Sequence, residues 1–110
     1  MEITKGKIIE INKKYGGHPI MGSNIDFDLD MAKKEKNIYR SNAYLIRGIV
    51  CGHSFSDGNK STAMEVTLRR FNKNNIKCDE KRLSKFFIKT AINNYPINKI
   101  ERSLRKICKK

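Results

Sequence analysis

The sequence predicts an all-α fold, a small helical bundle of five to six helices in one domain that spans residues 1–110. Apolar residues recur three or four positions apart in most segments, which places them on one face of a helix. No segment alternates apolar and polar residues with the period of a strand. Glycine, proline or asparagine separates the apolar segments. A chain of 110 residues suits one domain with one modest core.

Two helices are expected in the first half of the chain. In residues 1–15, isoleucines lie among lysines in an amphipathic pattern, and the Gly-Gly pair at 16–17 ends the helix. Residues 16–30 contain glycines, a proline and several acids, so a loop is expected there, and long loops in small domains are often functional. The second helix is expected over residues 37–51, where one face carries Tyr39, Ala43, Ile46 and Val50.

Three further helices are expected in the second half. One begins near Asn59 to Ser61 and runs to about Asn74. Asp79 suits the N-cap of a helix that continues to about Asn93, and Pro96 suits the first turn of the last helix. These three helices are expected to bury Ala63, Val66 or Thr67, Phe71, Leu83, Phe86, Phe87, Ile92, Ile97, Ile100, Leu104 and Ile107.

The net charge of +13, from 24 basic and 11 acidic residues, favours an anionic partner such as a nucleotide, a nucleic acid or an acidic protein. Most of these charges are expected on a solvated surface. A basic helical protein that binds nucleic acid is an alternative, but the sequence has no aromatic-interleaved basic stripe and no recognition helix, so nucleic acid is not the expected partner. No segment approaches the roughly 18 apolar residues of a membrane span, and none has the character of a secretory leader.

Three cysteines are present, Cys51, Cys78 and Cys108. Their number is odd and their spacings are long, so the pattern predicts neither a disulfide framework nor a closed zinc site. Reduced thiols and a cytoplasmic location are therefore expected.

The residues that carry chemistry lie between His53 and Ser61, where one expected helix ends and the next begins. The N-terminus of a helix offers unpaired N–H groups to a phosphate, and a glycine at 58 lets the backbone approach closely. Asp57 is a hard ligand suited to Mg²⁺, and the His53 imidazole can accept a proton near neutral pH. With donors at 59 and 60, this is a minimal site for phosphoryl or nucleotidyl transfer.

Ordinary readings of the same residues stay open. A lone histidine in a turn is more often structural than catalytic, and Asp-Gly-Asn is a common turn or cap. Two other motifs do not fit. Residues 58–62 lack the spacing and the preceding strand of a phosphate-binding P-loop, and Cys51, His53 and Asp57 match no common zinc site.

The string HSFSDGNKSTA over residues 53–63 resembles the signature of the Fic/Doc family, H-x-F-x-[D/E]-[A/G]-N-[G/K]-R. The positions that fit are His53, Phe55, Asp57, Gly58, Asn59 and Lys60. The lysine at 60, the short chain and the strings at 14–19 and 68–71 are similar to the Doc branch, the "death on curing" toxins. The resemblance is clearest over residues 14–75.

The resemblance implies a role for each of these residues. His53 would take a proton from the target hydroxyl, Phe55 would anchor the loop in the core, and Asp57 would hold Mg²⁺. The phosphates of ATP would be held by Gly58, Asn59, Lys60 and Ser61. A flap that positions the target would be formed by Gly16, Gly17, His18 and Pro19.

Fic proteins usually transfer AMP, whereas Doc transfers a phosphoryl group to elongation factor Tu, and its lysine is associated with an inverted nucleotide. Lys60 therefore favours an enzyme that moves a phosphoryl group from ATP to a hydroxyl of a target protein, such as a translation factor. The alternatives are a Fic-like AMP-transferase and a degenerate member that only binds a partner.

One position departs from the signature. Ser61 stands where the family has an arginine, and a serine cannot supply the bidentate, charged contact of a guanidinium to a phosphate. The expected consequence is weak or altered activity, unless Arg40 or Arg47 supplies the cation. The inhibitory string [S/T]-x-x-x-E-[G/N] of Fic proteins is absent, so a separate, acidic antitoxin is the expected inhibitor and partner.

Overall fold

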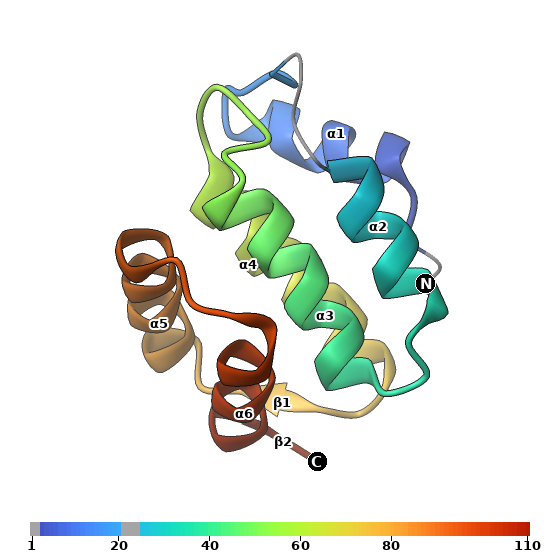
Figure 1. The fold of residues 1–110 in the computed structure, drawn as a ribbon, viewed down its shortest axis with the longest axis vertical. Coiled ribbons are helices and arrows are strands. Elements are labelled where there is room, and N and C mark those ends of the chain that lie inside the picture. The colour runs from blue at the N-terminus through green and yellow to red at the C-terminus, as the bar shows by residue number, and fades with distance from the viewer. Residues whose placement is uncertain (1–2, 21–24) are drawn as a thin grey trace.

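A computed structural model describes residues 3–20 and 25–110 and confirms the all-α prediction (Figure 1). The α-helices of the described residues are, in chain order, α1 (Lys5–Lys14), α2 (Ile25–Lys34), α3 (Ile38–Ile46), α4 (Asn59–Lys73), α5 (Glu80–Asn93) and α6 (Ile97–Ile107). A π-helical turn, η1 (Arg47–Cys51), follows α3 directly, so the single helix expected over residues 37–51 widens in its last turn.

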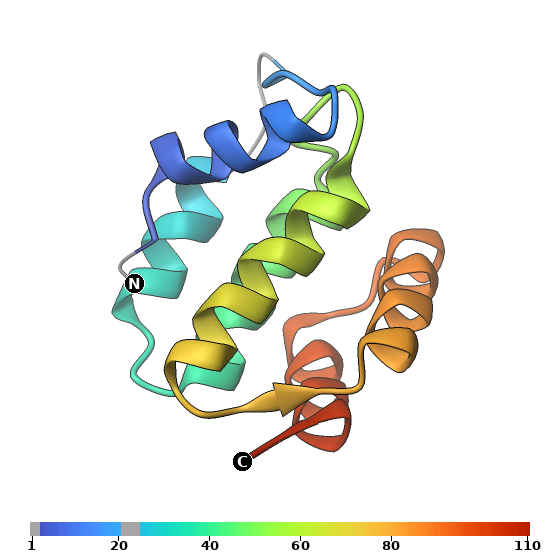
Figure 2. The ribbon, with the colours of Figure 1, turned by 180° about the vertical axis from the view of Figure 1, so that it is seen from behind.

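The helices α3 and α4 lie side by side in the middle of the molecule, with α1 and α2 on one flank and α5 and α6 on the other (Figures 1 and 2). The loop after α1 and the loop that leads into α4 meet at one end of the molecule in both views. This end contains the candidate site. None of the described helices is both long and apolar enough to cross a membrane.

The expected core is largely confirmed. The largest fully buried apolar side chains come from all six helices except α2, and also from η1 and the turn after α4: Phe71, Phe87, Ile8, Leu45, Ile46, Ile49, Ile76, Leu83, Ile100, Leu104 and Val66. The expectation that Ile92 is buried is wrong, since 76% of it is exposed. The buried face of α5 passes through Leu83, Phe87 and Thr90, which leaves Ile88 and Ile92 together on the outer face.

The loop expected over residues 16–30 is shorter than predicted, because residues 25–30 belong to α2. Ile25, Leu29 and Ala32 are buried at spacings of four and three, which is a helical face. Two of the three acids of this segment, Asp26 and Asp28, lie in the first turn of α2, where negative charge stabilises a helix. The part of the expected loop at 21–24 lies outside the described residues.

Two of the three cysteines are joined, which corrects the expectation of reduced thiols. Cys78 lies in a two-residue strand, β1 (Lys77–Cys78), that pairs antiparallel with β2 (Cys108–Lys109). Cys78 is directly opposite Cys108, and a disulfide connects them. This pairing could not be predicted, because 30 residues separate the two cysteines and each strand is too short to show alternation. Cys51 is free.

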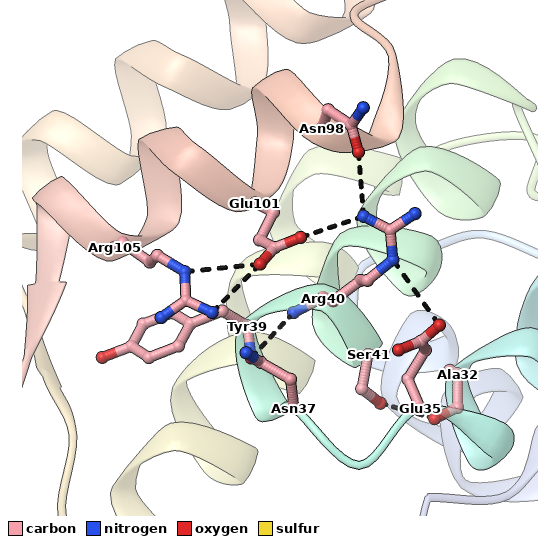
Figure 3. A network of polar contacts seen from close by, with 9 residues as sticks. All are labelled: Ala32, Glu35, Asn37, Tyr39, Arg40, Ser41, Asn98, Glu101 and Arg105. Atoms are coloured by element: carbon pink, nitrogen blue, oxygen red, sulfur yellow. Dashed lines mark hydrogen bonds and ion pairs between the residues drawn. The ribbon is translucent and has the colours of Figure 1, made fainter.

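A polar network attaches α6 to α3 (Figure 3). The guanidinium of Arg40 donates to Asn98 Oδ1 at 2.8 Å and to Glu101 Oε1 at 3.0 Å, and it lies 3.5 Å from a carboxylate oxygen of Glu35. Glu101 also accepts from Arg105 at 3.0 Å. These bonds hold Arg40, in the first turn of α3, against α6 (Figure 3).

Candidate active site

The loop over residues 52–58 is anchored to the core by Phe55, whose side chain is buried there. The side-chain amide of Asn59 holds the backbone of this residue at both ends: Phe55 N–H donates to Asn59 Oδ1 at 3.1 Å, and Asn59 Nδ2 donates to the Phe55 carbonyl at 2.9 Å. Ser54, also buried, donates to the carbonyl of Gly48 at 2.6 Å. The amide of Asn59 is thus already used to shape the loop, and one of its N–H groups remains for a ligand.

The residues predicted as a flap lie beside this loop. Ser56 N–H donates to the carbonyl of His18 at 2.9 Å, and Ile20 N–H donates to the carbonyl of Ser54 at 2.9 Å. Pro19 forms an antiparallel bridge with Phe55 between these two bonds. The end of the predicted flap, His18 and Pro19, is therefore paired with the loop over 52–58 by backbone hydrogen bonds, which fixes the two segments relative to each other.

The step from the loop into α4 occurs at Gly58, which has a φ of +70°. A Cβ there would lie 2.7 Å from the Cβ of Tyr15, so only glycine fits without movement. Asp57 Oδ1 accepts from the Gly58 N–H at 2.7 Å. No side chain caps α4, so the first three N–H groups of the helix stay available to an anion.

A cavity of about 480 Å³ opens in front of the N-terminus of α4. Its polar side is formed by the predicted site residues and one serine, namely His53, Ser56, Asp57, Gly58, Asn59, Lys60 and Ser61. Its apolar side is formed by the end of η1 and by α5, through Val50, Phe87, Ile88, Ala91 and Ile92. The fold thus brings the predicted base, metal ligand and phosphate-binding residues to one cavity, whereas the predicted flap residues do not line it.

His53, Asp57 and Lys60 are exposed in this cavity. His53 adopts a φ of +46°, which few non-glycine residues adopt and which often occurs at functional positions. Lys60 Nζ donates to Ser84 Oγ on α5 at 3.3 Å, which links the start of α4 to α5. Among the described residues, no three His, Cys, Asp or Glu side chains gather to hold a metal ion by themselves. A Mg²⁺ ion here would therefore take Asp57 and complete its coordination with phosphate oxygens and water.

Neither arginine that the sequence offered as a substitute cation reaches the cavity. Arg40 is committed to Asn98 and Glu101. Arg47 lines a different hollow, together with Asp28 and Cys51. In this hollow, burial raises the pKa of Asp28, and the nearby Arg47 opposes that shift. Among the described residues, the cavity therefore has Lys60 as its lysine or arginine side chain.

Sequence reasoning missed several residues of the site. The apolar side formed by α5 could have been found from Ile88 and Ile92, which are four residues apart on the charged outer face of a helix. No feature of the sequence could have indicated the role of Asn12. Asn12 is fully buried, and its Nδ2 donates to the carbonyl of Asp57 at 2.8 Å and to Thr62 Oγ1 at 3.0 Å.

Comparisons of this chain with models of protein families and with curated proteins find no match.

Proposed function

We propose that this protein binds Mg²⁺ and ATP at the cavity in front of α4 and transfers a phosphoryl group to a hydroxyl of a target protein. The observation that carries the proposal is the composition of the cavity: an imidazole, a carboxylate and a lysine surround an uncapped helix N-terminus. Phosphoryl transfer asks a protein mainly to position the reactants and to stabilise charge, and these groups suit that task.

The phosphates would lie at the N-terminus of α4. The backbone N–H groups of the first turn and the ammonium of Lys60 would neutralise them. One carboxylate oxygen of Asp57 is used by Gly58 N–H, and the other has no hydrogen-bond partner among the described residues, so it can ligate Mg²⁺. The apolar surface of α5, with Ile88 and Ile92 exposed on it, gives the remainder of the nucleotide apolar side chains to pack against.

Bound ATP would supply the transferable γ-phosphoryl group. His53 would accept the proton of the target hydroxyl as its oxygen bonds to the γ-phosphorus and the bond to the β-phosphate oxygen breaks, which leaves ADP and a phosphoester on the target. His53 is exposed and forms no hydrogen bond with another described residue, so it is accessible to a target side chain. The basic surface, with a net charge of +13, suits acidic partners, including a separate antitoxin.

The test is label transfer from ATP to a candidate target protein. With γ-labelled ATP and Mg²⁺ we expect label on the target, and with α-labelled ATP none. His53→Ala should reduce the transfer by at least about 10²-fold while leaving the fold intact, because His53 is exposed. Label from α-labelled ATP would instead indicate AMP transfer. Transfer of neither label, with no binding of Mg·ATP by calorimetry, would overturn the proposal.

Ser61→Arg is the companion variant. Ser61 lies in the first turn of α4 and lines the cavity, so an arginine there would place a guanidinium next to the phosphates. The expected result is a gain in transfer rate of about tenfold or more, in line with the weight of one charged donor at such a site. Ser61→Leu controls for the added volume and should give no gain.

A further inference from the structure

We propose that Asn12, on α1, is a positioning residue that fixes the conformation of the turn proposed to bind phosphate at the start of α4. The expected effect on nucleotide binding rests on the proposed function, whereas the role of Asn12 in fixing the turn rests on the geometry alone. The Asn12 side chain is fully buried at the C-terminal end of α1. Its two N–H groups donate to the Asp57 carbonyl at 2.8 Å and to Thr62 Oγ1 at 3.0 Å, across 45 and 50 residues of sequence.

These two acceptors lie on either side of the turn that would bind phosphate. Asp57 precedes Gly58, and Thr62 closes the first turn of α4 through its N–H, which donates to the Gly58 carbonyl at 2.9 Å. A single planar amide therefore connects both ends of the segment 57–62. Rotation of the Asp57–Gly58 peptide would break the first bond, so Asn12 fixes where the Asp57 carboxylate and the helix N–H groups point.

Gly17 makes room for this amide. A Cβ at Gly17 would collide with the Asn12 amide and with the Asp57 carbonyl. Asn12 Oδ1 has no hydrogen-bond partner among the described residues. An unpaired buried acceptor lowers stability, so an asparagine is a poor choice if this position only has to fill the interior. An asparagine is explained if its amide has to orient the turn.

Asn42 provides a matched control. It is also fully buried, and its Nδ2 donates to a threonine of α4, Thr67 Oγ1, at 2.7 Å. Thr67 lies in the middle of α4, away from the cavity. Alanine at either asparagine removes two hydrogen bonds, because Asn42 Oδ1 also accepts from Arg70 Nη1 at 3.1 Å, but only Asn12→Ala releases the turn.

The experiment compares Asn12→Ala with Asn42→Ala by urea unfolding and by calorimetric titration with Mg·ATP. Both variants should lose stability, while Asn12→Ala alone should weaken Mg·ATP binding, by about tenfold or more. Equal weakening in both variants, or binding by Asn12→Ala equal to that of the unmodified protein, would overturn the proposal. If Asn12→Ala does not fold, the isosteric pair Thr62→Val and Thr67→Val carries the same comparison, with an expected loss of about threefold for Thr62→Val only.

A second readout separates this inference from the proposed function. Backbone amide resonances of residues 57–61 should shift in Asn12→Ala and stay in place in Asn42→Ala, with no nucleotide present. If the unmodified protein does not bind Mg·ATP, the proposed function is wrong, and the resonances still decide the role of Asn12. Unchanged resonances of residues 57–61 in Asn12→Ala would refute that role.

Discussion

Gly58 lies where the loop turns into α4, and its backbone and its surroundings both exclude a side chain. Its φ is +70°, and a Cβ would approach Tyr15 to 2.7 Å. Gly58→Ala should therefore lower the free energy of unfolding by about 2–3 kcal/mol, through backbone strain and the forced movement of Tyr15. Urea unfolding measures the loss.

A substitution at Gly16 separates the cost of backbone strain from the cost of the steric contact. The φ of Gly16 is +79°, but a Cβ there would meet no atom within 4 Å. Gly16→Ala should cost only the strain of a left-handed alanine, about 1 kcal/mol. Equal losses in the two variants would mean that the contact with Tyr15 contributes nothing at position 58.

The residues of the candidate site divide by how far they lie from one another in sequence. His53, Asp57 and Lys60 could be predicted because a nine-residue pattern contains them and a turn between two helices brings neighbours together. Asn12 and Ile88 could not, since each reaches the site through packing of a distant helix. A single sequence carries no local signal of such contacts.

The helices α1 and α4 are joined by a carboxylate of α4 that accepts hydrogen bonds from two residues at the end of α1. Glu65 of α4 accepts from Lys14 Nζ at 2.6 Å and from the Tyr15 hydroxyl at 2.6 Å, both at the end of α1. Burial raises the pKa of Glu65, but these hydrogen bonds outweigh it and the pKa is lowered overall. The hydrogen bond between Tyr15 and Glu65 also raises the pKa of the Tyr15 hydroxyl.

The lowered pKa of Glu65 sets a direction for the dependence of stability on pH. Above pH 4.5, the ordinary pKa of glutamate, the ionised Glu65 carboxylate stabilises the folded state. This stabilisation is lost as the pH falls from 4.5 through the lower pKa that Glu65 has in the folded protein. Glu65→Gln should cost about 1 kcal/mol at pH 7, and the difference from the unmodified protein should vanish in acid. Unfolding curves at several pH values test this.

An exposed carboxylate of α1 serves as the control for that series. Glu10 is exposed and forms no ion pair with another described residue, so Glu10→Gln should change stability by less than about 0.5 kcal/mol. A difference between Glu65→Gln and the unmodified protein that persists unchanged at low pH would contradict the role assigned to the Glu65 carboxylate.

Helices were predicted well where an apolar face and a cap agreed. Asp79 was expected to cap α5, and its carboxylate accepts from the Arg82 N–H at 3.1 Å. The helix α2 was missed because the acids at its start suggested a loop, although Ile25 and Leu29 already had helical spacing. Acids favour the first turn of a helix as much as they favour loops, so composition alone could not decide between the two.

At the scale of the whole molecule, α5 and α6 form a unit that is closed at its base by the β1–β2 pair. The disulfide between Cys78 and Cys108 closes a loop of chain that contains both helices, and the Arg40 network attaches α6 to α3. Since α5 forms the apolar side of the cavity, the placement of this unit decides the width of the candidate site. Sequence could not predict the closure, which depends on contacts between the two ends of a 30-residue segment.

Opening the disulfide should therefore destabilise the molecule. Closing a loop of 30 residues is expected to contribute about 3–4 kcal/mol by restricting the unfolded chain, so the reduced protein should unfold at a clearly lower urea concentration than the oxidised one. In urea without reductant, the protein should show one reactive thiol, that of Cys51. Cys51→Ser should then show none and keep its response to reductant, because the Cys78–Cys108 bond is untouched. Three reactive thiols in the unreduced protein, or unfolding curves that coincide with and without reductant, would show that these two cysteines are not joined in solution.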